Sequence, residues 1–212
     1  MTLNVAQRAV DASAESAFVV LGRARELEAQ GKKIIHLEIG EPDFVTPVHI
    51  REAAIEALRK GETHYAPTPG LPELREAIAW KTKEDLGIDL NWRENVVVTI
   101  GAKEGIFAAL ASVLEPGDEV IFPDPGYPAY EGAAKFFDAK PVPIELSEEN
   151  AFRMTVEEVS ALVTNRTKAI VLNSPENPTG SVLRREDVKA IAELAKEKGI
   201  YVISDEIYKY IT

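Results

Sequence analysis

The chain has 212 residues, of which 45% are hydrophobic and 28% charged, so it can bury a sizeable core. Acidic residues outnumber basic ones by 35 to 24, and this balance argues against nucleic acid, whose binding needs clustered Lys and Arg. The absence of cysteine excludes disulfides, thiolate metal sites and a cysteine nucleophile, and no metal site is predicted. No run approaches the roughly 20 apolar residues of a membrane span, and the N-terminus lacks a signal-peptide pattern. A cytoplasmic location is therefore expected.

Amphipathic stretches alternate along the chain with short apolar, β-branched runs, and Gly or Pro marks the joins. Helices are expected over residues 13–30, 47–60, 72–86, 102–114, 127–137, 155–163 and 184–198. Strands are expected over residues 34–39, 96–100, 119–122, 141–146, 168–172 and 200–204. Thr155 and Glu158 have the spacing of a capping box at the start of one helix, and Gly199 is placed to end the last helix.

This alternation predicts an α/β fold, in which a mostly parallel sheet has helices on both faces and right-handed crossovers. Several predicted strands are apolar throughout, as strands covered on both faces are. Residues 1–33 precede the alternation and are assigned to an N-terminal arm or a second domain. In such sheets ligands bind beyond the carboxyl ends of the strands, so the residues that follow each strand are the first candidates for a site.

Two of the strand ends carry features that favour a flat, anionic ligand. Residues 96–100 run into Gly101, Ala102 and Lys103 and then a helix, where backbone N–H groups and the helix dipole attract an anion. The alternative is a tight turn without a ligand, and the glycines of a nucleotide-binding loop are missing. Residues 119–122 run into a proline-rich turn that fixes Tyr127, whose ring could stack on a ligand or pack on the next helix.

Two further strand ends carry an amide and an acid. Residues 168–172 lead to a turn with two X-Pro peptides, Ser174-Pro175 and Asn177-Pro178, which either presents the Asn177 amide to a ligand or is a plain turn. Residues 200–204 lead to Asp205, with Tyr208 close behind it. Asp205 could serve a nucleotide-bound Mg²⁺, pair with a buried cationic ring, or cap a helix. The first reading needs a Walker A loop, which the chain lacks.

Together these strand ends supply an anion cradle, a stacking ring, a carboxamide, and a buried acid beside a phenol. This set complements pyridoxal 5'-phosphate group by group, which is much more specific than any one feature.

The chain resembles class I/II aminotransferases of the aspartate aminotransferase type, which have the type I pyridoxal-phosphate fold. The resemblance runs from about Ile34 to the last residue. The segments that carry it are Gly40-Glu41-Pro42-Asp43-Phe44, Tyr65 with Gly70-Leu71-Pro72-Glu73-Leu74-Arg75, Asn177-Pro178-Thr179-Gly180, and Ser204-Asp205-Glu206-Ile207-Tyr208. It implies that residues 1–33 form an N-terminal arm within the small domain, and that residues 34–212 form a large cofactor-binding domain, incomplete at its C-terminus.

The resemblance also implies a role for each matching residue around the cofactor. Gly101, Ala102 and Lys103 would hold the cofactor phosphate, and Tyr127 would stack on the pyridine ring. Asp205 would pair with the ring nitrogen. The remaining contacts, to the ring hydroxyl oxygen, would come from Asn177 and Tyr208.

Substrate and subunit contacts follow from the same resemblance. Gly40, Tyr127 and Asn177 would line the substrate site, with the Gly40 backbone facing the substrate carboxylate. Tyr65 would reach the phosphate of a neighbouring subunit, which implies a homodimer with shared active sites. The substrates would be an amino acid and a 2-oxo acid.

The family's Schiff-base lysine is expected a few tens of residues beyond the Asp205–Tyr208 segment, outside these 212 residues. No catalytic residue is therefore assigned within the chain, which is expected to be inactive alone and active as part of a complete enzyme. Another reaction on the same fold, such as that of a lyase or decarboxylase, and a non-catalytic truncated relative stay open as alternatives.

Overall fold

The computed structural model describes residues 5, 6, 8 and 16–211. The chain divides into two compact units, which are described separately below. Unit 1 combines Met1–Val19 with Ile100–Thr212, and unit 2 is Val20–Thr99. The predicted division after residue 33 stays a prediction. The first predicted helix corresponds to α2, Ser16–Ala29, and its expected start over residues 13–15 lies outside the described residues.

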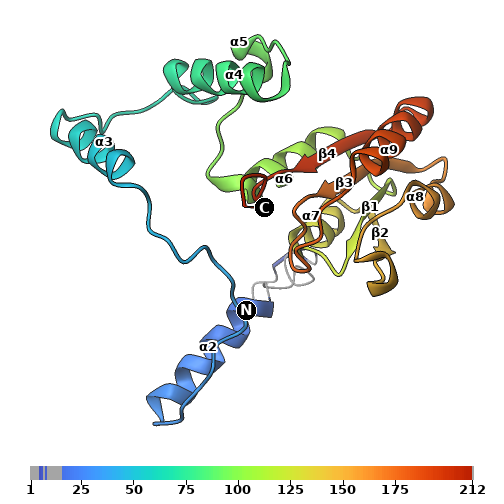
Figure 1. The fold of residues 1–212 in the computed structure, drawn as a ribbon, viewed down its shortest axis with the longest axis horizontal. Helices are drawn as coiled ribbons and strands as arrows, with labels where there is room; N and C mark the ends of the chain where they lie inside the picture. The colour runs from blue at the N-terminus through green and yellow to red at the C-terminus, as the bar shows by residue number, and fades with distance from the viewer. Residues whose placement is uncertain (1–4, 7, 9–15, 212) are drawn as a thin grey trace. The chain divides into compact units, whose positions relative to one another are not determined.

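Unit 1 is built on a parallel sheet, shown in Figure 1, which holds all the strands of the described residues. The strands lie in the order β2-β1-β3-β4 and each neighbouring pair is parallel. Their bounds are β1 Glu119–Asp124, β2 Lys140–Glu145, β3 Thr167–Asn173 and β4 Tyr201–Asp205. The two central strands, β1 and β3, are almost entirely buried, as their apolar sequences predict.

Helices cover both faces of this sheet, because successive side chains of a strand point to opposite faces. Val120 and Phe122 of β1 pack into one hydrophobic cluster with α6 (Gly101–Val113) and α7 (Ala129–Phe136). Ile121 packs into a second cluster with α8 (Val156–Leu162) and α9 (Arg185–Lys198). Unit 1 also contains a short 3₁₀ helix, η1, at Glu148–Asn150, and the first four residues of α2. The predicted α/β fold with helices on both faces is confirmed.

The capping box predicted at the start of α8 is present. The Thr155 hydroxyl oxygen accepts from the Glu158 N–H at 3.3 Å, and the Glu158 carboxylate accepts from the Thr155 N–H at 3.0 Å. Thr155→Ala is therefore expected to lower the free energy of unfolding by about 1 kcal/mol. Urea denaturation measures this change. Ser160→Ala, at an exposed position within the same helix, is the control and should be neutral or slightly stabilising. Equal midpoints for the two variants would contradict the capping role.

Unit 2 contains the part of α2 from Val20 to Ala29, together with α3 Val48–Arg59, α4 Pro72–Leu86 and α5 Trp92–Asn95. Helix α4 matches its predicted bounds, with proline in its first turn and Gly87 in the left-handed conformation at its end. Buried Arg75 joins α4 to the segment around α5, because its guanidinium donates to the carbonyl oxygens of Val96 (2.8 Å) and Arg93 (2.9 Å).

Two predicted strands are wrong: residues 34–39 and 96–100 form no ladder in the described part of the chain. Their β-branched sequences fit a pleated strand, but a strand also needs a neighbour to pair with. In the second segment, the Val98 N–H donates to the Pro69 carbonyl, and the Val96 carbonyl accepts from Arg75. Ile35 and Leu37 of the first segment are 82% and 89% exposed. Neither segment therefore joins the sheet.

Candidate active site

The carboxyl ends of three strands gather polar side chains at one edge of the sheet of unit 1. Strand β1 ends at Asp124, β3 at Asn173 and β4 at Asp205, and parallel pairing brings these ends to the same edge. Asn173 and Asp205 are direct partners in the register of β3 and β4. We call this the carboxyl edge.

Asp205 is the most constrained acid at the carboxyl edge. It is buried, at 9% exposure, and its Oδ2 atom accepts a hydrogen bond of 2.8 Å from the Tyr130 hydroxyl. Its Oδ1 atom accepts from the Ile207 N–H at 3.3 Å. Tyr208, predicted to act beside Asp205, is half-buried in the turn that follows β4. Both carboxylate oxygens of Asp205 are thus held, and a carboxylate has room for a further donor.

Asn173 ties the turn after β3 to the end of β4. Its side-chain amide donates to the Asp205 carbonyl oxygen at 3.0 Å, while its side-chain oxygen accepts from the Asn177 N–H at 2.8 Å. Asn177 is half-buried in this turn. The position of Asn177 is therefore fixed through Asn173 relative to Asp205.

Glu176 is a second buried acid next to this turn. Its Oε2 atom accepts from the Thr179 N–H at 2.9 Å and from the Thr179 hydroxyl. Burial raises the pKa of Glu176 above its ordinary value, and the Thr179 contacts only partly oppose this. The contacts of Glu176 hold the turn that carries Asn177 in shape.

Tyr127 follows a tight turn at the end of β1. Its ring lies edge-on to the ring of Tyr130, with centroids 5.7 Å apart and an interplanar angle of 85°. The turn depends on Gly126, since a Cβ atom there would lie 2.0 Å from the Pro123 carbonyl oxygen. The ring predicted to stack on a ligand therefore contacts the Tyr130 ring and follows a turn that has no room for a side chain at Gly126.

The predicted anion site lies at the start of α6, where the first N–H groups of a helix have no partner within that helix. Gly101 has φ +79°, which favours glycine, and a Cβ atom there would meet no other atom within 4 Å. The Lys103 ammonium lies 5.8 Å from the Tyr127 ring centroid. Glu104 accepts from the Ile100 N–H. Gly101, Ala102 and Lys103 thus begin a helix that bears a cation close to the Tyr127 ring.

Contacts connect these residues in series across three elements. They run from Lys103 to Tyr127, from Tyr127 to Tyr130, and from Tyr130 to Asp205. Tyr130 was not predicted as a site residue, although it lies three positions after Tyr127 and so on the same side of a helical turn. Asn173 was also missed, although it is a polar residue that ends a buried strand, as Asp205 does.

Gly40 and Tyr65 lie in unit 2, where both are exposed. Their predicted contacts with the substrate carboxylate and with a neighbouring subunit stay predictions.

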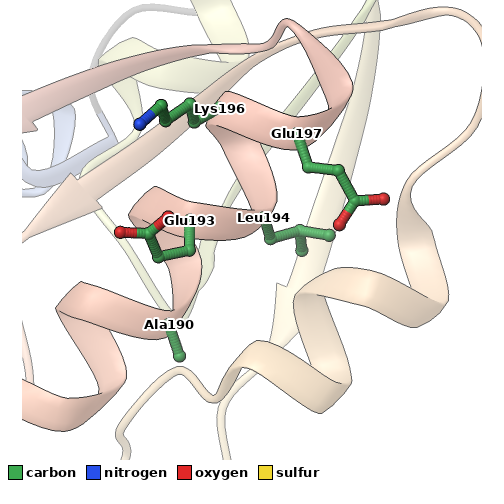
Figure 2. A pocket seen from close by; sticks show the side chains of 5 residues that line it. All are labelled: Ala190, Glu193, Leu194, Lys196 and Glu197. Atoms are coloured by element: carbon green, nitrogen blue, oxygen red, sulfur yellow. The ribbon is translucent and has the colours of Figure 1, made fainter.

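Two hollows lie in the described part of unit 1, and the second of them is beside the carboxyl edge, where Asn173 and Glu176 line it. One lies on α9, and Figure 2 shows that its five side chains all come from that helix, with Lys196 and Glu197 pointing in opposite directions. The other, lined in part by Met154, Glu176 and Ser181, has a volume of about 10 Å³, too small for a cofactor. Within residues 5, 6, 8 and 16–211, no His, Asp and Glu side chains gather as a metal site. No described helix is long and apolar enough to cross a membrane.

Comparison with known proteins identifies the family. The model of aminotransferase class I and II matches residues 32–211. A probable aspartate/prephenate aminotransferase of Aquifex aeolicus is 44% identical over 210 residues, which are 99% of this chain and 53% of the relative. An aspartate aminotransferase of Pyrococcus horikoshii is 48% identical over 191 residues, 89% of this chain and 49% of the relative.

Solved structures agree with this result. An aspartate aminotransferase from Thermus thermophilus with maleate superposes with a TM-score of 0.91 at 40% identity, over 96% of this chain and 53% of that one. An alanine aminotransferase from Pyrococcus furiosus superposes with a TM-score of 0.91 at 38% identity, over 97% of this chain and 52% of that one. The chain spans about half the length of the curated relatives that it matches. The resemblance predicted from the sequence motifs is confirmed: the chain belongs to the class I and II aminotransferase family.

Proposed function

We propose that this chain is part of an enzyme that uses pyridoxal 5'-phosphate to transfer an amino group between an amino acid and a 2-oxo acid. The observation that carries the proposal is the series of contacts from Lys103 through Tyr127 and Tyr130 to Asp205 at the carboxyl edge. This series combines a cation, an aromatic ring and a buried acid in a chain of the aminotransferase family.

The chemistry of these side chains fits the cofactor. The start of α6, with Gly101, Ala102 and Lys103, suits a phosphate, because helix N–H groups and an ammonium both attract an anion. The face of Tyr127 suits a flat ring, and buried Asp205 suits a protonated ring nitrogen. Asn177 and Tyr208 would donate to the ring hydroxyl oxygen. When bound, the cofactor supplies a ring that accepts electrons from the substrate.

Asp205 keeps the ring nitrogen protonated in this proposal. A carboxylate that faces a pyridinium at short range favours the charged form of both groups, and burial strengthens their attraction. The Tyr130 and Ile207 contacts hold the carboxylate in a single orientation. The proton on the ring nitrogen is thus maintained by an acid that has little freedom to turn away.

Gly40 and Tyr65 complete the proposal in the whole protein. Gly40 would face the substrate carboxylate, together with Tyr127 and Asn177. Tyr65 would reach the phosphate of a neighbouring subunit in a homodimer. The relatives are named as aspartate, aspartate/prephenate, alanine and aromatic-amino-acid aminotransferases. The donor of the amino group is therefore proposed only as an amino acid.

A transfer assay with glutamate labelled at its amino nitrogen tests this function. The complete protein is expected to move the label from glutamate to a 2-oxo acid, because the proposed reaction conserves the amino group. The 212-residue chain alone is expected not to do so, since the Schiff-base lysine is proposed to lie outside it. After borohydride reduction, the chain alone should keep its mass of 23.3 kDa without a phosphopyridoxyl adduct. Release of ammonia or carbon dioxide by the complete protein, without labelled product, would instead identify a lyase or a decarboxylase.

A further inference from the structure

Tyr130 has a role at the carboxyl edge that packing alone does not explain. It is the largest of the fully buried side chains and belongs to the hydrophobic cluster beneath α6 and α7. It nevertheless touches two residues of the proposed cofactor site at once, since its hydroxyl donates to Asp205 and its ring meets that of Tyr127 edge-on. These two contacts link the ring-stacking residue to the acid.

We propose that Tyr130 is a positioning residue, which holds the Asp205 carboxylate in place for the ring nitrogen of the cofactor. This inference rests on the proposed function. A buried tyrosine hydroxyl usually finds an acceptor, and a backbone carbonyl would have been enough. Here the acceptor is a carboxylate 75 positions away in sequence, at the end of β4.

The geometry lets Tyr130 act through Asp205 without touching the cofactor. The Tyr130 hydroxyl donates to the Oδ2 atom of Asp205, and the Ile207 N–H donates to its Oδ1 atom. Rotation of the carboxylate would therefore break both hydrogen bonds. The remaining acceptor capacity of Asp205 stays available for the ring nitrogen.

Tyr130 can act only as a donor in this arrangement. Burial raises its pKa well above the ordinary value, and the negative charges of Asp205 and Glu176 raise it further. The phenol therefore stays protonated over the whole working range of pH, and the hydrogen bond to Asp205 does not switch.

The test compares two probes on the complete protein. One is pyridoxal 5'-phosphate, and the other is its deaza analogue, which has C–H in place of the ring nitrogen. Tyr130→Phe keeps the ring but removes the donor, so it should weaken binding of pyridoxal 5'-phosphate by about tenfold, as loss of a charge-assisted hydrogen bond would. Binding of the deaza analogue should change little. The measured quantity is the ratio of the two dissociation constants for each variant, because the folded fraction affects both constants equally and cancels in their ratio.

Tyr201→Phe is the matched control, because Tyr201 starts the same strand as Asp205 and is 54% exposed. It should leave the ratio unchanged. With Asp205→Asn in the background, Tyr130→Phe should add no further change. An equal loss of affinity for both probes, or no loss for either, would overturn the positioning role. Failure of the unmodified complete protein to bind either probe would instead overturn the proposed function on which the inference rests.

Discussion

Asp205→Ala in the complete protein is expected to weaken binding of pyridoxal 5'-phosphate by on the order of 10- to 150-fold and to abolish amino transfer. The first figure corresponds to the roughly 1.5–3 kcal/mol of a hydrogen bond to a charged group. Amino transfer should be lost because Asp205 is the acid proposed to keep the ring nitrogen protonated. Equilibrium titration of the apoprotein with the cofactor measures the affinity, and the labelled-nitrogen assay measures turnover.

The same substitution should also destabilise the apoprotein. It leaves the buried Tyr130 hydroxyl without its acceptor, which costs roughly 1–3 kcal/mol in the free energy of unfolding. Asp205→Asn separates the two effects, because the amide oxygen can still accept from Tyr130 but carries no charge. It should restore much of the stability and little of the affinity.

Glu206→Ala is the control for position, since Glu206 follows Asp205 directly but is exposed and bonds Ser204. Its cofactor affinity should match that of the unsubstituted protein. Wild-type turnover in Asp205→Ala would show that the acid at the end of β4 does not face the ring nitrogen, and the proposed site would have to be abandoned.

The sequence predicts the central sheet well because its signals are local. Strands β1 and β3 are apolar on both faces. Pro128 precedes α7, a capping box starts α8, and Gly199 ends α9. Residues 96–100 have equally strong strand propensity, yet they bond to Pro69 and Arg75 instead of to a neighbouring strand. Pairing depends on a partner elsewhere in the chain, which a local pattern does not contain.

The sequence also predicts only part of the candidate site. Asp205 and Asn177 were predicted because each follows an apolar run at a strand end. Tyr130 and Asn173 were missed because their decisive contacts join residues 75 and 32 positions apart. Such contacts exist only once β1, β3 and β4 lie side by side in the folded sheet. A short sequence motif therefore does not identify the residues that support the site.

Gly126→Ala is expected to disturb both stability and cofactor binding, because the turn before Tyr127 has no room for a side chain. The added Cβ atom would lie 2.0 Å from the Pro123 carbonyl oxygen and 3.0 Å from its carbonyl carbon. Pro123 belongs to the buried part of β1, so the Gly126–Tyr127 backbone has to give way. Overpacking of this kind costs about 1–3 kcal/mol in the free energy of unfolding. The Tyr127 ring would move with its backbone and leave the position in which it meets Tyr130.

Gly132→Ala provides a matched control in the helix that follows. A Cβ atom at Gly132 meets no atom within 4 Å outside the helix's own backbone, and alanine within a helix is more favourable than glycine by roughly 0.5–1 kcal/mol. Gly132→Ala should therefore raise the urea midpoint and preserve cofactor affinity, whereas Gly126→Ala should lower both. Because the chemical change is identical, opposite signs for the two variants come from the surroundings, which are an open helical position at Gly132 and the Pro123 carbonyl at Gly126. Equal effects would mean that the Pro123–Tyr127 turn tolerates a side chain and that Tyr127 is not held by it.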